Sequence, residues 1–266
     1  MAFNDYIDKE TRNFLLIFAG LAIFLVFIFP RLEPYLLTLD LSQPATSLFP
    51  EVSNVVSIEK PTEIVLDQNK DYKAHIQTSV GDFEIDLFEK SAPKNVSNFL
   101  SILSAYPNAV MNIEKDFLIK VDSNSNIRYN VDDEINADYL LLDTIKVKDA
   151  PYLRNAYDPN DPTTKAFEPN NLRKYEDFTV KQFYSEILGY KYDTSFATPK
   201  AVKYTVYMAS TGPNTNKANF FILMAGSVPE IDGRYTPIGR VTEGFTTLDK
   251  INNSETSVKL RSIVIQ

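Results

Sequence analysis

The chain has 266 residues, and its 27 Lys and Arg against 35 Asp and Glu give a net charge of −8. This length allows one sizeable domain with accessory segments, and the lack of a basic cluster argues against a nucleic-acid partner. Because the sequence has no cysteine and no glycine-rich phosphate loop, disulfides, thiolate metal sites and thiol nucleophiles are excluded and nucleotide binding is unsupported.

The first 66 residues suggest a tail, a membrane anchor and a linker. Residues 1–12 form the tail, and residues 13–30 carry no charge. About 18 apolar residues suffice for a helix to cross a bilayer, so we predict a transmembrane helix at 13–30. The alternatives are a buried core helix and a cleaved signal peptide, but the segment is apolar on every side and no A-x-A site follows it promptly. Residues 31–66 contain four prolines, which predicts a linker with limited regular structure.

Charges around the apolar segment indicate its orientation. Lys9 and Arg12 precede it, whereas Arg31 is the only basic residue in 31–59. Because basic residues favour the cytoplasmic side, we expect a single-pass cell-membrane protein whose soluble domain is extracytoplasmic.

The soluble region begins with a predicted hairpin. Residues 73–78 and 83–88 alternate apolar and polar side chains around Gly81, which suits a tight turn. The only histidine, His75, lies in the first strand. A catalytic triad or a multi-histidine metal site would need it, and the alternation favours an ordinary strand histidine, so no metal site is predicted.

An amphipathic helix follows the hairpin. Pro93 suits a first helical turn, and Val96, Phe99, Leu100 and Leu103 recur at helical spacing. Further along, acidic residues at 132–134 and at Asp158 and Asp161 are possible calcium ligands. Neither run has the glycine-bearing loop of a recognised calcium site, so solvated turns are predicted there.

The remaining elements predict a mainly β fold. Residues 204–210 and 219–225 resemble buried strands, 236–253 a strand leading into a short helix, and 258–266 a terminal strand. A sheet whose first and last strands pair closes on itself and leaves no exposed edge, so we expect a closed barrel with capping helices.

A segment at about 137–198 does not alternate like a strand, and we interpret it as an insertion lying over the domain. It contains one clear helix signal: Thr179 is placed to cap a helix with Gln182 three residues later, and Gly189 is placed to end it.

Several runs in this order resemble the cyclophilins, a family of peptidyl-prolyl isomerases with an eight-stranded barrel. The runs are HIQTSVGDFEIDLFEKSAPKNVSNFLSI, DFLI, YNVDDEIN, VYMASTGPNTNKANFFILMA and IDGRYTPIGRVTEGFTTLDKI. The resemblance implies a cyclophilin-like domain over 67–266 that needs no cofactor and binds proline-containing polypeptide segments. It extends to the membrane-anchored cyclophilin-like proteins of bacteria.

The resemblance also implies a proline pocket. Phe221 corresponds to its floor, and the polar run before Phe221 corresponds to the wall of the groove. By the same correspondence, Phe117, Leu118 and Ile231 keep apolar character, Ala209 and Ser210 belong to the wall, Tyr235 replaces a histidine, and Lys120 and Asn219 replace glutamines. The alternative interpretation is that these residues only belong to the core.

One departure bears on catalysis. The family's arginine, which is held to assist rotation about the proline amide, corresponds here to Asn112, a shorter and uncharged donor. Two hypotheses remain open: a membrane-tethered isomerase, weak in turnover, that assists the folding of exported proteins, or an inactive domain that binds proline-containing peptides or serves as a structural subunit of a membrane complex.

Overall fold

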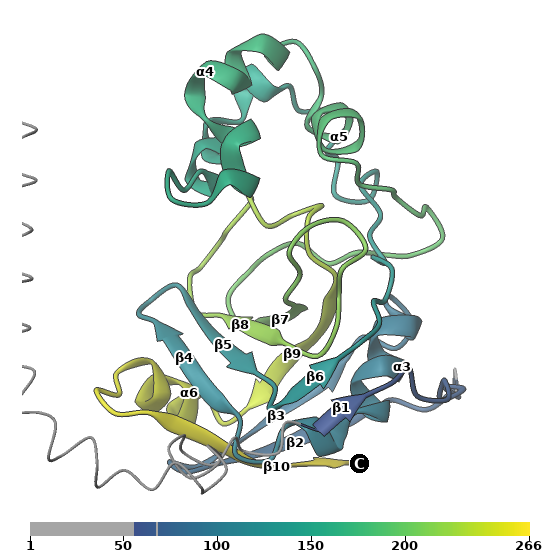
Figure 1. Ribbon diagram of the computed structural model, residues 1–266, viewed down its shortest axis with the longest axis vertical. Coiled ribbons are helices and arrows are strands. Elements are labelled where there is room, and N and C mark those ends of the chain that lie inside the picture. The colour runs from purple at the N-terminus through teal and green to yellow at the C-terminus, as the bar shows by residue number, and fades with distance from the viewer. Residues whose placement is uncertain (1–55, 68) are drawn as a thin grey trace, which may run out of the picture. The chain divides into compact units, whose positions relative to one another are not determined.

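The computed structural model describes residues 56–67 and 69–266 (Figure 1). The predicted tail, the predicted transmembrane helix at 13–30 and most of the predicted linker lie outside these residues. Within the described ranges, no helix combines the length and the apolar character that crossing a bilayer requires.

Eight strands form a closed barrel, which confirms the predicted mainly β barrel. They pair in the order β10-β2-β3-β9-β7-β8-β5-β4, and β10 also pairs with β4 to close the barrel. The strands are β2 (Lys73–Thr78), β3 (Asp82–Leu87), β4 (Val110–Glu114), β5 (Leu118–Asp122), β7 (Thr205–Met208), β8 (Phe220–Leu223), β9 (Pro237–Glu243) and β10 (Val258–Ile265).

Side chains that alternate along the strands point into the barrel and fill its interior. In β2, every second side chain is buried, beginning with Ala74, as expected for a strand with one face on a core. Two helices, α3 (Pro93–Ser101) and α6 (Phe245–Asn252), accompany the barrel. Phe99 of α3 packs edge-on against Phe220 of β8, with ring centres 5.7 Å apart, so the predicted apolar face of this helix is in the core.

A short strand occupies part of the predicted linker. β1 (Val56–Ile58) pairs in parallel with β6 (Ser125–Ile127). Farther along, Leu66 is buried in the barrel core, and the carbonyl of Ile64 accepts a hydrogen bond from Ser97. The end of this segment is therefore ordered because the folded domain supplies partners that a proline-rich sequence does not reveal.

The acidic run at 132–134 is not the solvated turn that the sequence suggested. Glu134 is 2% exposed, and its carboxylate accepts hydrogen bonds from the backbone amides of Lys94 and Asn95. These amides lie in the first turn of α3, whose own N-cap residue, Ala92, offers no side-chain acceptor. A carboxylate about 40 positions away in the chain thus satisfies the free amides of the helix N-terminus.

Residues 137–198 form the inserted segment with a hydrophobic cluster of its own, which includes Leu153, Phe167, Phe183 and Tyr184. Thr179 forms the predicted capping box with Gln182 at the start of α5. The segment's regular elements are short: α4 (Pro169–Leu172), α5 (Val180–Gln182), a π-helical turn at Phe183–Ile187, and 3-10 turns at Val147–Asp149, Pro151–Ala156, Pro162–Phe167 and Arg173–Tyr175.

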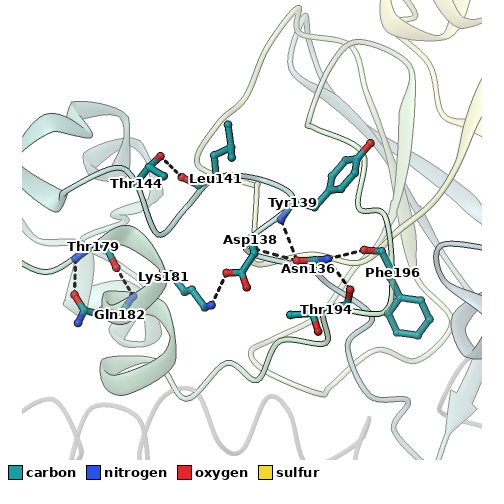
Figure 2. A network of polar contacts seen from close by, with 10 residues as sticks. All are labelled: Asn136, Asp138, Tyr139, Leu141, Thr144, Thr179, Lys181, Gln182, Thr194 and Phe196. Atoms are coloured by element: carbon teal, nitrogen blue, oxygen red, sulfur yellow. Dashed lines mark hydrogen bonds and ion pairs between the residues drawn. The ribbon is translucent and has the colours of Figure 1, made fainter.

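Asn136 joins the two ends of the insertion (Figure 2). Its side-chain amide donates to the carbonyls of Thr194 and Phe196, at 3.1 and 2.7 Å, and its Oδ1 accepts from the amides of Asp138 and Tyr139, both at 3.0 Å. Its own backbone amide donates to Thr198 Oγ1. Because Asn136 is buried, these bonds have no water to replace them.

The insertion packs on the loop at 228–235, which leads into β9. Gly233 has a left-handed backbone, and a Cβ there would collide with Leu142 and crowd Tyr184 of the insertion. Tyr192 donates a hydrogen bond to the Gly233 carbonyl at 3.0 Å. Glycine is therefore required at 233 both by conformation and by the close approach of the insertion.

We predict that Asn136→Ala lowers the free energy of unfolding by about 2 to 4 kcal/mol, because several buried backbone groups lose their partner at once. Urea unfolding measures this loss, and hydrogen exchange should accelerate across the insertion. Asn170→Ala, at an exposed position of α4, is the matched control and should change little. If Asn136→Ala lowered the free energy of unfolding no more than Asn170→Ala does, the hydrogen bonds of Asn136 would not be what holds the two ends of the insertion together.

Burial also predicts the pH dependence of stability. Burial raises the pKa of Asp232 to about 6, although its Oδ1 accepts a hydrogen bond from the Ala201 amide. The folded state therefore binds more protons than the unfolded state between about pH 4 and pH 6, and this group makes stability fall as the pH rises through that window. Burial raises the pKa values of Asp133 and Glu134 as well, which adds to the same trend.

Asp232→Asn keeps the acceptor and removes the ionisation. We expect a flatter stability profile between pH 4 and pH 6 and an unfolding free energy at pH 7 that is higher by about 1 to 3 kcal/mol. Urea unfolding at several pH values is the measurement, with Asp249→Asn at an exposed position of α6 as control. A variant that is less stable than the parent at pH 7 would show that the ionised form is favoured instead.

Candidate functional site

Four residues on neighbouring strands form one row across the barrel wall. Asn112 of β4 pairs with Lys120 of β5, Lys120 with Phe221 of β8, and Phe221 with Tyr207 of β7. Figure 1 shows β4 and β5 side by side, with β8 and β7 beyond them. Residues directly opposite one another in antiparallel strands present their side chains on the same face, so the row is one continuous surface.

The apolar end of the row is an aromatic cluster outside the barrel core. The Phe221 ring stacks on Tyr207 with centres 5.4 Å apart and meets Tyr235 edge to face at 5.3 Å. Ile231 is buried in the same cluster, and Phe117 lies at its border together with Leu118, Ala209 and Tyr235. The structure thus brings together all the apolar residues that the resemblance placed in the pocket.

Phe221 itself is only 5% exposed. Tyr235, at the position where the resemblance places a histidine, lies perpendicular to this ring, with the two planes at 87°. The expected floor of the pocket is therefore accessible over only a small part of its surface.

The polar end of the row converges on one carboxylate, Asp122. Its Oδ2 accepts a hydrogen bond from Asn112 Nδ2 at 2.7 Å, and its Oδ1 accepts one from Asn219 Nδ2 at 2.7 Å. Lys120 Nζ lies 2.9 Å from the same Oδ1. The three residues that the resemblance places at the family's arginine and glutamine positions thus share a single acid, and each of them already donates one N–H to it.

The groove wall lies between two cavities. A cavity of about 320 Å³ is lined by Lys120 and Asn219 together with Ala209 and Ser210. Ser210 also lines a second cavity, of about 370 Å³, on the side of the insertion. Phe221 is not among the lining residues of either cavity, so the structure places open space beside the aromatic cluster rather than over it.

The sequence patterns did not single out three residues of this region, Tyr207, Asp122 and Arg234. Two of them could have been found by strand alternation, because Asp122 is two positions after Lys120 and Tyr207 is two positions before Ala209. No sequence pattern points to Arg234. Its guanidinium lies 4.4 Å above the ring centre of Phe167, and only the folded insertion brings these residues together.

Comparison with known proteins identifies the family. The family model described as cyclophilin type peptidyl-prolyl cis-trans isomerase/CLD matches residues 73–266. Human peptidyl-prolyl cis-trans isomerase-like 3 is 28% identical over 182 residues, which cover 66% of this chain and 79% of that protein. The Dictyostelium discoideum peptidyl-prolyl cis-trans isomerase cypE is 27% identical over 189 residues, which cover 68% of this chain and 85% of that protein.

Among solved structures, a cyclophilin-type peptidyl-prolyl cis-trans isomerase of Cryptosporidium parvum aligns with a TM-score of 0.45 and 22% identity, over 74% of this chain and 98% of that one. The human and Dictyostelium discoideum relatives are eukaryotic, so the resemblance to bacterial membrane-anchored proteins stays a prediction. The family model alone spans well over half of the sequence. This chain therefore belongs to the cyclophilin-type peptidyl-prolyl cis-trans isomerase family.

Proposed function

We propose that this chain is a membrane-tethered isomerase that binds proline-containing segments of exported proteins at the row from Asn112 to Tyr207 and isomerises them slowly. One observation carries the proposal: an aromatic cluster around Phe221 adjoins amide and ammonium donors on the same face of the barrel. An apolar hollow for the proline ring with a few polar groups for the flanking backbone is what recognition of such a segment requires.

Slow turnover follows from the donors that are present. The uncatalysed barrier to rotation about the amide is about 18 to 20 kcal/mol. A donor to the proline nitrogen lowers it only where the bond strengthens as the amide twists. Asn112 is neutral and already donates to Asp122. Lys120, between Asn112 and Phe221, is charged, but its ammonium is paired with the same carboxylate.

A second candidate function has its own observation in favour. Because Phe221 is 5% exposed and packs against Tyr207 and Tyr235, the face also suits a domain that has no turnover. Such a domain would bind proline-containing peptides without isomerising them, or serve as a structural subunit of a membrane complex. A single measurement separates these possibilities.

That measurement is NMR exchange spectroscopy on a short X-Pro peptide with the full-length protein in detergent. We expect slow catalysis that Phe221→Ala abolishes. Replacing Asn112 by Arg together with Asp122→Asn, which frees the new guanidinium from its acid, should raise the rate by about 100-fold or more, the scale of one oriented donor.

The matched control for that gain is Asn170→Arg together with Asp249→Asn, which makes the same charge change at two exposed positions. Peptide binding without acceleration in the parent protein supports the second candidate as a binding domain. Neither binding nor acceleration leaves only the structural role. A gain from this control pair equal to that from the substitutions at 112 and 122 would show that the row is not the site.

The membrane tether and its orientation rest on residues 1–31. We expect protease added to intact cells to digest the domain and leave a membrane-bound fragment that contains residues 13–30. Replacing two central residues of this segment, Ile23 and Val26, by Asp should release the protein from the membrane fraction. Full protection of the domain in intact cells, with digestion only after lysis, would reverse the orientation.

A further inference from the structure

The cavity of about 370 Å³ lies between the insertion and the groove wall at 210–213. Phe167 and Tyr190 line it from the insertion, Ser210 lines it from the wall, and Arg234 and Tyr235 line it from the loop before β9. The insertion thus adds a compartment directly beside the aromatic cluster.

Arg234 brings a positive charge to this cavity. Among the ion pairs of residues 56–67 and 69–266, none includes Arg234. Its Nε is buried and has no hydrogen-bond partner. Its guanidinium carbon lies 4.4 Å from the ring centre of Phe167 and 5.5 Å from that of Tyr235, so cation–π contact offsets part of the cost of burial. The half-buried guanidinium still lacks a charged partner within that part of the chain, which favours an anionic ligand.

A second unsatisfied group lines the same cavity. Ser210 Oγ is also buried without a hydrogen-bond partner. An arginine offers only donors, and a serine hydroxyl offers one donor and two acceptor lone pairs. A carboxylate accepts several hydrogen bonds and therefore satisfies both groups at once.

The charge of that ligand is limited by Asp161, which lines the cavity as well. The hydroxyl and the backbone amide of Thr163 donate to its Oδ1 at 2.7 and 2.9 Å, and these bonds lower its pKa and keep it ionised. With a net charge of −8 on the whole chain, a doubly charged phosphate is repelled more strongly than a single carboxylate.

Tyr235 links this cavity to the proposed proline site. Its ring centre lies 5.3 Å from that of Phe221 and 5.5 Å from the Arg234 guanidinium carbon, so that carbon lies at most about 11 Å from the Phe221 ring centre. An extended peptide advances about 3.3 to 3.6 Å per residue, so one chain can reach both places within about three residues.

We propose that the cavity at Arg234 binds the carboxylate of an Asp or Glu side chain within about three residues of the proline in the bound segment. The inference rests on the proposed function and specifies its substrate class: acidic, proline-containing segments.

The test uses fluorescently labelled heptapeptides with a central proline. A single Glu is placed at each position on either side of the proline, each peptide has a Gln counterpart, and binding to the full-length protein in detergent is followed by anisotropy. We expect a Glu peptide to bind roughly 10-fold more tightly than its Gln counterpart at one position or more. Arg234→Gln should remove this preference, and Arg173→Gln, an exposed arginine of the insertion, should retain it.

A second readout does not depend on proline binding or on the folding of the variant. The NMR signal of Arg234 Nε–H in the parent protein is followed as Ac-Glu-NH2 or Ac-Gln-NH2 is added, and only the former should shift it. Ser210→Ala should weaken that shift.

The outcomes separate the two proposals. Equal affinity for every Glu and Gln pair, with peptides still bound, overturns the carboxylate site and leaves the proposed function standing. If no peptide binds, the proposed function fails, and the Arg234 signal then decides: a shift with Ac-Glu-NH2 alone retains a carboxylate site, and no shift overturns it.

Discussion

Side chains alternate between the two faces of a β-strand, and the rest of this structure depends on that constraint. Each residue of β8 faces either the barrel interior or its outer surface, so the adjacent phenylalanines at 220 and 221 are separated into two different environments. Phe220 joins Phe99 and Tyr106 in the core, and Phe221 joins Tyr207 and Tyr235 outside it. The pairing of β10 with β4 closes the barrel, so that one aromatic group lies inside it and the other outside.

In the polar half of the site, the donor side chains share one acceptor. Asn112, Lys120 and Asn219 differ from the family's arginine and glutamines, and all three contact the carboxylate of Asp122. An acid beside a lone ammonium and two amides gives each of them an internal partner. The donors of this row therefore form a cluster neutralised by Asp122. Under the proposed function, this cluster keeps polar contacts for a peptide backbone and offers a twisted amide less electrostatic assistance than a free cationic donor would.

The insertion provides much of the surroundings of this site on the side of the loop at 228–235. It has its own aromatic core, it is joined at its two ends by Asn136, and it packs on the loop that carries Ile231, Gly233 and Tyr235. This packing places Phe167 under the guanidinium of Arg234 and creates the cavity next to the groove wall. The same barrel without this segment would leave that loop without its aromatic cover.

The sequence by itself determined the features that depend on local periodicity and turn chemistry. These include the hairpin around Gly81, the helix that begins at Pro93, the capping box of Thr179, and the barrel whose first and last strands pair. The motif spacing also selected Phe221 and its apolar neighbours. Only the tertiary structure decided that Glu134 caps α3, that Asp122 gathers three donors, and that Arg234 lies over Phe167. Contacts between residues far apart in the chain leave no periodic signal, because their energy comes from burial and pairing that exist only after folding.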